Sequence, residues 1–195
     1  MIILQDKNSK DAALLFDDWP NPYVTARLLG VLQNKGVPGN FFLIDMGTEQ
    51  SPEIVRQIGN AGHEIGNHTY TYKRLPQLLE EYGKQAELVE SYYGDNIMMY
   101  SLAVSDWEED HNWNEEYKEA LTQQAERIAS EWRQITENGT LLGFHDSSKH
   151  NLPGNKLFAM WQNRALPTLE AVTQIVDFLI AEGFSIKRLS DMELD

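Results

Sequence analysis

Short apolar runs alternate with helix-spaced apolar patterns along most of this chain. Apolar runs of this length, bounded by turn residues, are typical of buried strands. Apolar residues three or four positions apart, as in the segments between the runs, are typical of amphipathic helices. The sequence predicts strands at 12–16, 40–44, 63–67, 97–104, 140–144 and 184–187, and helices at 23–35, 51–61, 76–93, 114–137 and 167–182. This alternation indicates an α/β fold with a mostly parallel sheet.

Length and composition exclude several classes of protein. A chain of 195 residues corresponds to one domain, taken here as 1–195. A net charge of -14 disfavours binding to nucleic acid and to anionic membranes, and no apolar run approaches the roughly 20 residues of a membrane span, so we expect no membrane insertion. Without cysteine there is no disulfide or thiolate site. No signal peptide is visible at the start, which leaves the localisation open.

Three of the predicted strands end in side chains that can do chemistry: Asp17-Asp18, Asn67-His68 and His145-Asp146. In parallel α/β folds the functional site lies at the carboxyl ends of the strands. We therefore predict one site built from these three strand ends, with the turn after the first strand enforced by Pro20 and Pro22.

Carboxylates and imidazoles together suit a borderline cation such as zinc. A carboxylate and an imidazole that are not ligands would then be available as general base and general acid. Structural alternatives exist for each group. Asp17 and Asp18 are candidates for capping the following helix, and His68 is a candidate turn residue.

Five segments, in order along the chain, resemble NodB-type polysaccharide deacetylases, carbohydrate esterase family 4. They are residues 13–22 around Phe-Asp-Asp-Trp-Pro, 39–44 (Gly-Asn-Phe-Phe-Leu-Ile), 62–70 (Gly-His-Glu-Ile-Gly-Asn-His-Thr-Tyr), 141–146 (Leu-Leu-Gly-Phe-His-Asp) and 168–189. The resemblance implies a distorted (β/α) barrel and removal of N-acetyl or O-acetyl groups from an acetylated oligo- or polysaccharide. Members of this family are usually extracellular or in the cell envelope.

The resemblance also implies a role for each matching residue. Asp17 is the general base, and His145 is the general acid that protonates the leaving amine. Asp18 and His68 are ligands of a divalent metal, with zinc as the expected ion. Trp19, Tyr70 and Trp107, together with Trp161, are candidates for stacking on sugar rings, with packing in the core as the alternative for each.

The sequence departs from the family pattern at several positions. Tyr72 stands where the family has its second metal-binding His, and a neutral phenol is a poor ligand. The Arg-containing segment is not found, and only 37 residues separate His68 from Asp106, as if a strand–helix unit were deleted and the barrel incomplete. Trp19 replaces a Gly. The third ligand is then water, Tyr72, or a distant side chain such as His111 or His150.

Two readings of the function follow from these departures. In the first, the chain is an active metal-dependent deacetylase with a reduced set of ligands. In the second, it is a catalytically impaired relative that binds carbohydrate or has a structural role. A metal-free hydrolase is a weaker third alternative, because nothing would polarise the acetyl carbonyl.

Overall fold

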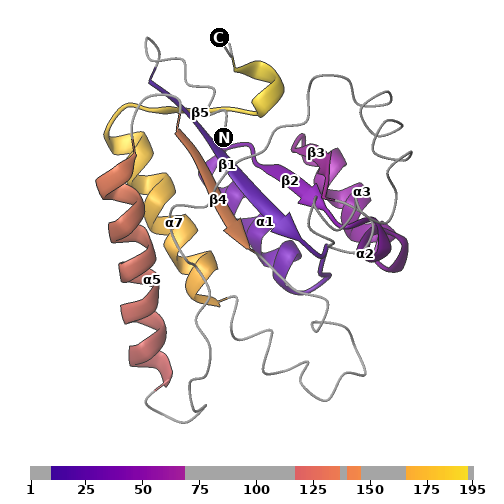
Figure 1. The fold of residues 1–195 in the computed structure, drawn as a ribbon, viewed down its shortest axis with the longest axis horizontal. Coiled ribbons are helices and arrows are strands. Elements are labelled where there is room, and N and C mark those ends of the chain that lie inside the picture. Colours follow the sequence, from indigo (N-terminus) through magenta and orange to yellow (C-terminus); the bar gives the residue numbers. More distant parts are fainter. Residues whose placement is uncertain (1–9, 69–116, 137–139, 146–165, 193–195) are drawn as a thin grey trace, which may run out of the picture.

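The computed structural model describes residues 10–68, 117–136, 140–145 and 166–192 of the chain. At its centre is a sheet of parallel strands in the order β3-β2-β1-β4, with β5 pairing with the start of β1 (Figure 1). The strands are β1 (Asp11–Asp18), β2 (Asn40–Leu43), β3 (Glu64–Asn67), β4 (Thr140–His145) and β5 (Ser185–Ile186). The predicted α/β class with a parallel sheet is confirmed.

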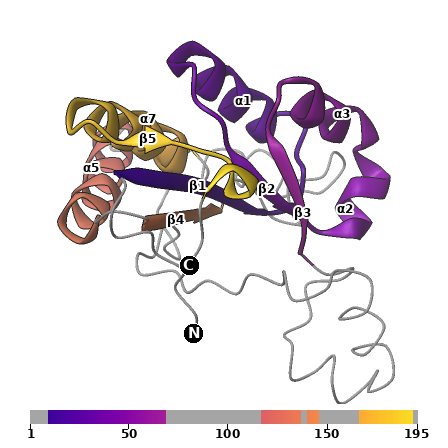
Figure 2. The same ribbon diagram turned by 90° about the horizontal axis from the view of Figure 1, so that it is seen from above.

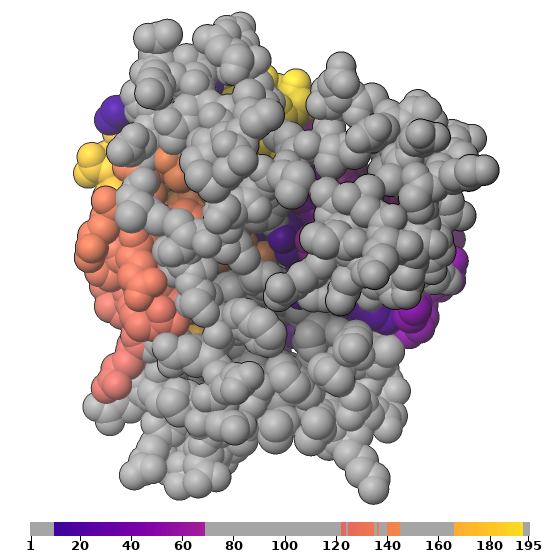
Figure 3. Space-filling model, viewed as in Figure 1, coloured from indigo at the N-terminus to yellow at the C-terminus, as the bar shows by residue number. Residues whose placement is uncertain are grey.

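The helices in the described parts of the chain are α1 (Val24–Lys35), α2 (Asp45–Gln50), α3 (Pro52–Asn60), α5 (Tyr117–Ile135), α7 (Leu166–Ala181) and the 3-10 helix η2 (Leu189–Asp191). Helices α1, α3 and α7 lie on one side of the sheet (Figure 2). Helix α5 packs against α7 and forms one flank of the molecule, with α2 and α3 on the opposite flank (Figure 3). None of the described helices combines the length and hydropathy that a membrane span requires.

Strand β1 is buried on both faces, which explains its unbroken apolar sequence. Ala12, Leu14 and Phe16 belong to the large core between the sheet and the helices. Ala13 and Leu15 alternate with them and pack on the other face, in a small cluster with Leu189 and Met192. Because side chains alternate along a strand, the two sets mark the two faces of the sheet.

Aromatic rings form the centre of the larger core. The ring of Phe16 lies 5.1 Å from that of Phe41 and 5.8 Å from that of Phe144, between their centroids. Trp132 of α5 packs on Phe144 at 5.7 Å and so joins this helix to β4. Each such pair adds about 0.5–1.5 kcal/mol beyond the area it buries. The rings thus connect β1 to β2 on one side and to β4 on the other.

Each predicted strand and helix that falls within the described residues is present, with ends that differ by at most three residues. Helices α2 and η2 were not predicted, since both are too short to show a helical period. The predicted helix 76–93 and strand 97–104 lie outside the described residues. The sheet formed by the described strands is open, with β3 and β4 at its two edges, as expected for an incomplete barrel.

Candidate metal and catalytic site

The chain leaves the sheet through a sharp turn at the end of β1. Asp18 has a φ of +93°, a conformation that non-glycine residues rarely adopt and that Asp tolerates better than most. The carbonyl oxygen of Asp18 accepts a hydrogen bond from the N–H of Ile44 at 3.0 Å. This conformation interrupts the regular alternation of β1 at its last residue. The turn predicted from Pro20 and Pro22 therefore begins on Asp18, two residues before the first of these prolines.

The helix cap that follows the turn is made by Asn21. Its Oδ1 accepts hydrogen bonds from the N–H groups of Tyr23 and Val24, at 2.8 and 3.0 Å. Its own N–H donates to Thr25 Oγ1 at 2.9 Å. A polar side chain that binds the first free N–H groups of a helix is the usual form of a cap. The structural alternative for Asp17 and Asp18 as caps of α1 is therefore wrong.

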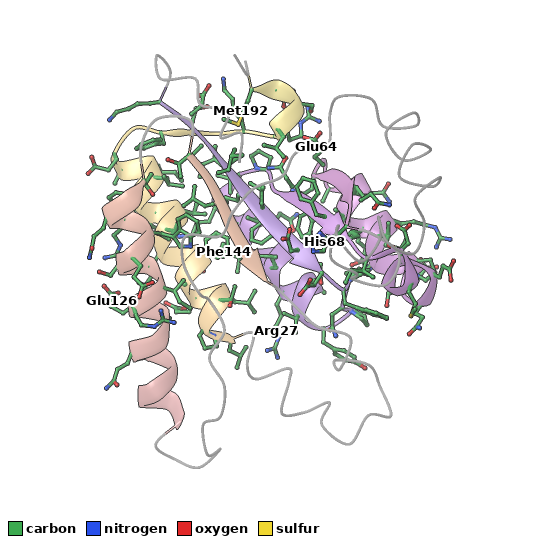
Figure 4. All side chains as sticks on the ribbon, viewed as in Figure 1. Arg27, Glu64, His68, Glu126, Phe144 and Met192 are labelled. Atoms are coloured by element: carbon green, nitrogen blue, oxygen red, sulfur yellow. The ribbon has the colours of Figure 1, made fainter. Side chains whose placement is uncertain are left out.

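Asp18 and His68 lie side by side although they come from different strands. His68 directly follows β3, and its side chain lies near the carboxyl end of β1 (Figure 4). The Nε2 atom of His68 is 3.6 Å from Oδ1 of Asp18, and the two side chains are 31% and 13% exposed. This separation is too long for a hydrogen bond. Oδ1 of Asp18 is buried and has no hydrogen-bond partner among the described residues.

An unpaired buried carboxylate oxygen beside an imidazole nitrogen fits two ligands of one metal ion. Two atoms bound at about 2.0–2.1 Å to a tetrahedral zinc lie roughly 3.3–3.4 Å apart, close to the 3.6 Å between these two atoms. Across the described ranges, no group of three or more His, Cys, Asp or Glu side chains is placed to hold a metal. The predicted third ligand Tyr72 and its alternatives His111 and His150 lie outside those ranges.

Asp17 and His145 are neighbours across β1 and β4. The strand register pairs these two residues directly. Asp17 is 5% exposed and continues the alternation of Ala13 and Leu15, which places it on the sheet face turned away from α1, α3 and α7. The residues predicted as base and acid thus belong to adjacent strand ends, one residue before the turn that carries Asp18.

One polar contact at this edge was not predicted. The side-chain amide of Asn67 donates to both carboxylate oxygens of Asp45, at 3.1 and 3.2 Å. Asp45 begins α2 and lies two residues beyond the end of β2. The same reasoning that selected polar residues at the ends of the other strands would have selected Asp45. The contact fixes the residue that precedes His68.

The candidate sugar-binding aromatics have different positions. Trp19 is only 4% exposed. Stacking on a sugar requires an exposed ring face, so the burial of Trp19 agrees with packing in the core, the alternative given for it. Tyr70, Trp107 and Trp161 lie outside the described residues. Stacking by these three residues stays a prediction.

Comparisons with known proteins agree with the resemblance found in the sequence. The model of the polysaccharide deacetylase family matches residues 5–116, more than half of the chain. A peptidoglycan-N-acetylglucosamine deacetylase from Bacillus cereus is 42% identical over 74 residues, which are 38% of this chain and 27% of that protein. The match therefore spans about a quarter of that relative's length.

Two further relatives are similar over nearly the whole chain. A chitooligosaccharide deacetylase from Azorhizobium caulinodans is 25% identical over 206 residues, covering 94% of each protein. Among solved structures, a family 4 acetyl xylan esterase from Clostridium thermocellum in complex with a cobalt ion superposes with a TM-score of 0.62 at 22% identity, over 92% of this chain and 88% of that one. The fold is that of these enzymes.

Proposed function

Since this chain belongs to the polysaccharide deacetylase family, we propose that it is a metal-dependent hydrolase that removes acetyl groups from an acetylated carbohydrate. The observation that carries the proposal is the Asp18–His68 pair, with Oδ1 and Nε2 3.6 Å apart. It lies beside Asp17 and His145, which are paired in the strand register. Two candidate ligands and a candidate base and acid thus meet at one end of one sheet.

Asp18 and His68 would hold the divalent ion, and zinc is the ion we favour because a carboxylate and an imidazole are both common zinc ligands. When bound, such an ion supplies Lewis-acid chemistry, since it polarises an acetyl carbonyl and lowers the pKa of water toward about 7. The structure of the Clostridium thermocellum relative in complex with a cobalt ion supports a divalent ion as the cofactor. The third ligand in this proposal is water, Tyr72, or a distant side chain such as His111 or His150.

Asp17 would take the proton of the attacking water. It is almost fully buried, so its carboxylate has little freedom to turn away from the site. His145 would then give a proton to the nitrogen of the leaving amine as the acetyl group departs. Each of these two proton transfers typically contributes about 10²–10⁴-fold to a rate.

The relatives support an acetylated amino sugar as the substrate. One acts on N-acetylglucosamine of peptidoglycan and another on chitooligosaccharides, by their names. Release of acetate from an amide needs protonation of the leaving nitrogen, because an amide anion is a very poor leaving group. The role proposed for His145 is therefore most needed on N-acetylated substrates.

The proposal is tested by acetate release from acetylated chito-oligosaccharides with added zinc. Asp17→Asn keeps the size of the side chain but cannot accept the proton, and His145→Ala removes the acid. We expect each variant to lose about 10²–10⁴-fold in rate while it keeps the wild-type melting temperature within a few degrees. Equal acetate release from wild type and both variants, at the level of the blank, would leave the second reading, a carbohydrate-binding relative without catalysis.

A further inference from the structure

The indole of Trp19 is packed against a glycine of the next helix. A Cβ atom placed on Gly47 would lie 2.8 Å from Cδ2 of Trp19 and 2.9 Å from Cδ of Pro20. Real Cβ atoms do not approach other carbons this closely, so only glycine fits at this position. Trp19 and Gly47 therefore form a matched pair, in which a large residue after the strand requires the absence of a side chain on α2.

Among the parts of the chain that the structure describes, the indole is held by packing and makes no polar contact. Trp19 is 4% exposed, and its Nε1–H is buried with no hydrogen-bond partner among the described residues. Within the described residues, apolar packing is therefore what holds the ring. The shape of the ring, packed against Gly47 and next to Pro20, thus fixes its position.

The two candidate metal ligands are attached to the same corner of the chain, where β2 passes into α2. The carbonyl oxygen of Leu43 accepts a hydrogen bond from the N–H of His68 at 2.9 Å, and the N–H of Ile44 donates to the carbonyl oxygen of Asp18 at 3.0 Å. The indole of Trp19 adds a third contact to this corner through Gly47. Asp18 is thus held at this corner by its own carbonyl oxygen and by the indole of the residue that follows it.

We propose that Trp19 is a positioning residue, which holds the strained backbone of Asp18 against the β2–α2 corner and so aims Oδ1 of Asp18 at His68. The inference rests on the proposed function, since it concerns the metal pair. Asp18 has a φ of +93°, and a residue in such a conformation relaxes unless its surroundings hold it. The packed indole, one residue further along, supplies that restraint.

Cobalt(II) tests the proposal, because its visible absorption reports the number and geometry of its ligands. The variant is Gly47→Ala, which pushes the indole and Pro20 away without changing a ligand. Its matched control is Gly30→Ala in α1, where a Cβ would have no atom within 4 Å. Both substitutions exchange glycine for alanine within a helix and have similar effects on helix propensity.

We expect Gly47→Ala to weaken cobalt binding at least tenfold and to alter the visible spectrum, and Gly30→Ala to match the wild type in both. Trp19→Ala should weaken binding by itself. In the Trp19→Ala background, Gly47→Ala should have a smaller effect, because only the close contact with Pro20 remains, and a double-mutant cycle measures this coupling. If Gly47→Ala does not fold, Trp19→Phe and Trp19→Ala replace it, with a graded loss of affinity expected.

The outcomes separate this inference from the proposed function. Wild-type affinity and spectrum in Gly47→Ala, or in both Trp19 variants, would overturn the positioning role and reduce Trp19 to a core residue. The metal site itself would survive that result as long as Asp18→Asn abolishes cobalt binding. A wild-type protein that binds no cobalt, or binds it equally after Asp18→Asn, would overturn both.

Discussion

Oδ1 of Asp18 lies 3.6 Å from Nε2 of His68, and adjacent residues of β2 and its extension fix both backbones. The carbonyl oxygen of Leu43 accepts a hydrogen bond from the N–H of His68, and the N–H of Ile44 donates one to the carbonyl oxygen of Asp18. The backbone position of each candidate ligand is therefore held by a neighbouring segment as well as by its own strand. The separation of the two atoms therefore depends on how the ends of β1, β2 and β3 pair.

Replacing Asp18 with Asn separates its role as a ligand from its role in the turn. Asn tolerates positive φ as well as Asp does, so we expect Asp18→Asn to fold normally, and to be at least as stable without metal because a mostly buried charge is gone. Zinc at 100 times its dissociation constant should stabilise the wild type by about 2.7 kcal/mol, and the variant far less. Melting temperatures with and without zinc measure the difference. An equal zinc-induced shift in both proteins would place the metal elsewhere.

Restoring the second histidine of the family pattern should strengthen the site. We expect Tyr72→His to bind zinc more tightly and to release acetate faster, because an imidazole is a far better ligand than a neutral phenol. Calorimetric titration measures the affinity, and acetate release measures the rate. Tight binding without a gain in rate would show that the missing Arg segment, and not the third ligand, limits the chemistry.

Burial of His63 should make the fold sensitive to acid. Nδ1 of this residue accepts a hydrogen bond from the N–H of Gly39 at 3.1 Å, and burial lowers the pKa of the imidazole below its usual 6.5. The unfolded chain therefore binds a proton at a higher pH than the folded chain does. Stability is fully present above about pH 6.5 and falls as the pH drops below it.

The variant His63→Asn tests this assignment, since its side-chain oxygen can accept the Gly39 hydrogen bond but does not titrate in this range. Urea unfolding at several pH values should give a shallower loss of stability between pH 6.5 and 5 for His63→Asn than for the wild type. Parallel curves would mean that acid acts on other groups.

The cap made by Asn21 should be the main local support of α1. Asn21→Ala removes the acceptor of two helical N–H groups and should lower the free energy of unfolding by about 1–2 kcal/mol. Asn21→Asp keeps an acceptor and should cost much less. Denaturant unfolding of both variants provides the comparison. An Ala variant as stable as the Asp variant would show that the cap contributes nothing.

Much of this architecture could be predicted because local patterns and global fold agree. The apolar run around Phe16 indicates a strand buried on both faces, and it is one. Polar residues at the ends of three strands indicate a common site, and parallel pairing brings Asp17 opposite His145 as that rule requires.

Other features depend on contacts that no local pattern contains. The positive φ of Asp18 occurs together with a hydrogen bond to Ile44, 26 positions away. The need for glycine at position 47 exists only because Trp19 packs there. Helix α2 is six residues long, less than two full turns, and therefore shows no apolar period. Trp19, which the sequence makes a candidate for stacking on a sugar ring, is buried, and its packing against Gly47 is a contact between distant residues of the chain.

Acetate release from acetylated chito-oligosaccharides, before and after removal of metal, tests the central claim most directly. The wild type should lose its activity after dialysis against a chelator and regain it when zinc or cobalt is restored. Asp18→Asn should stay inactive with either ion while melting, without metal, at or above the wild-type temperature. Acetate release that survives chelation, or that Asp18→Asn retains after the ion is restored, would contradict a metal-dependent deacetylase built on Asp18 and His68.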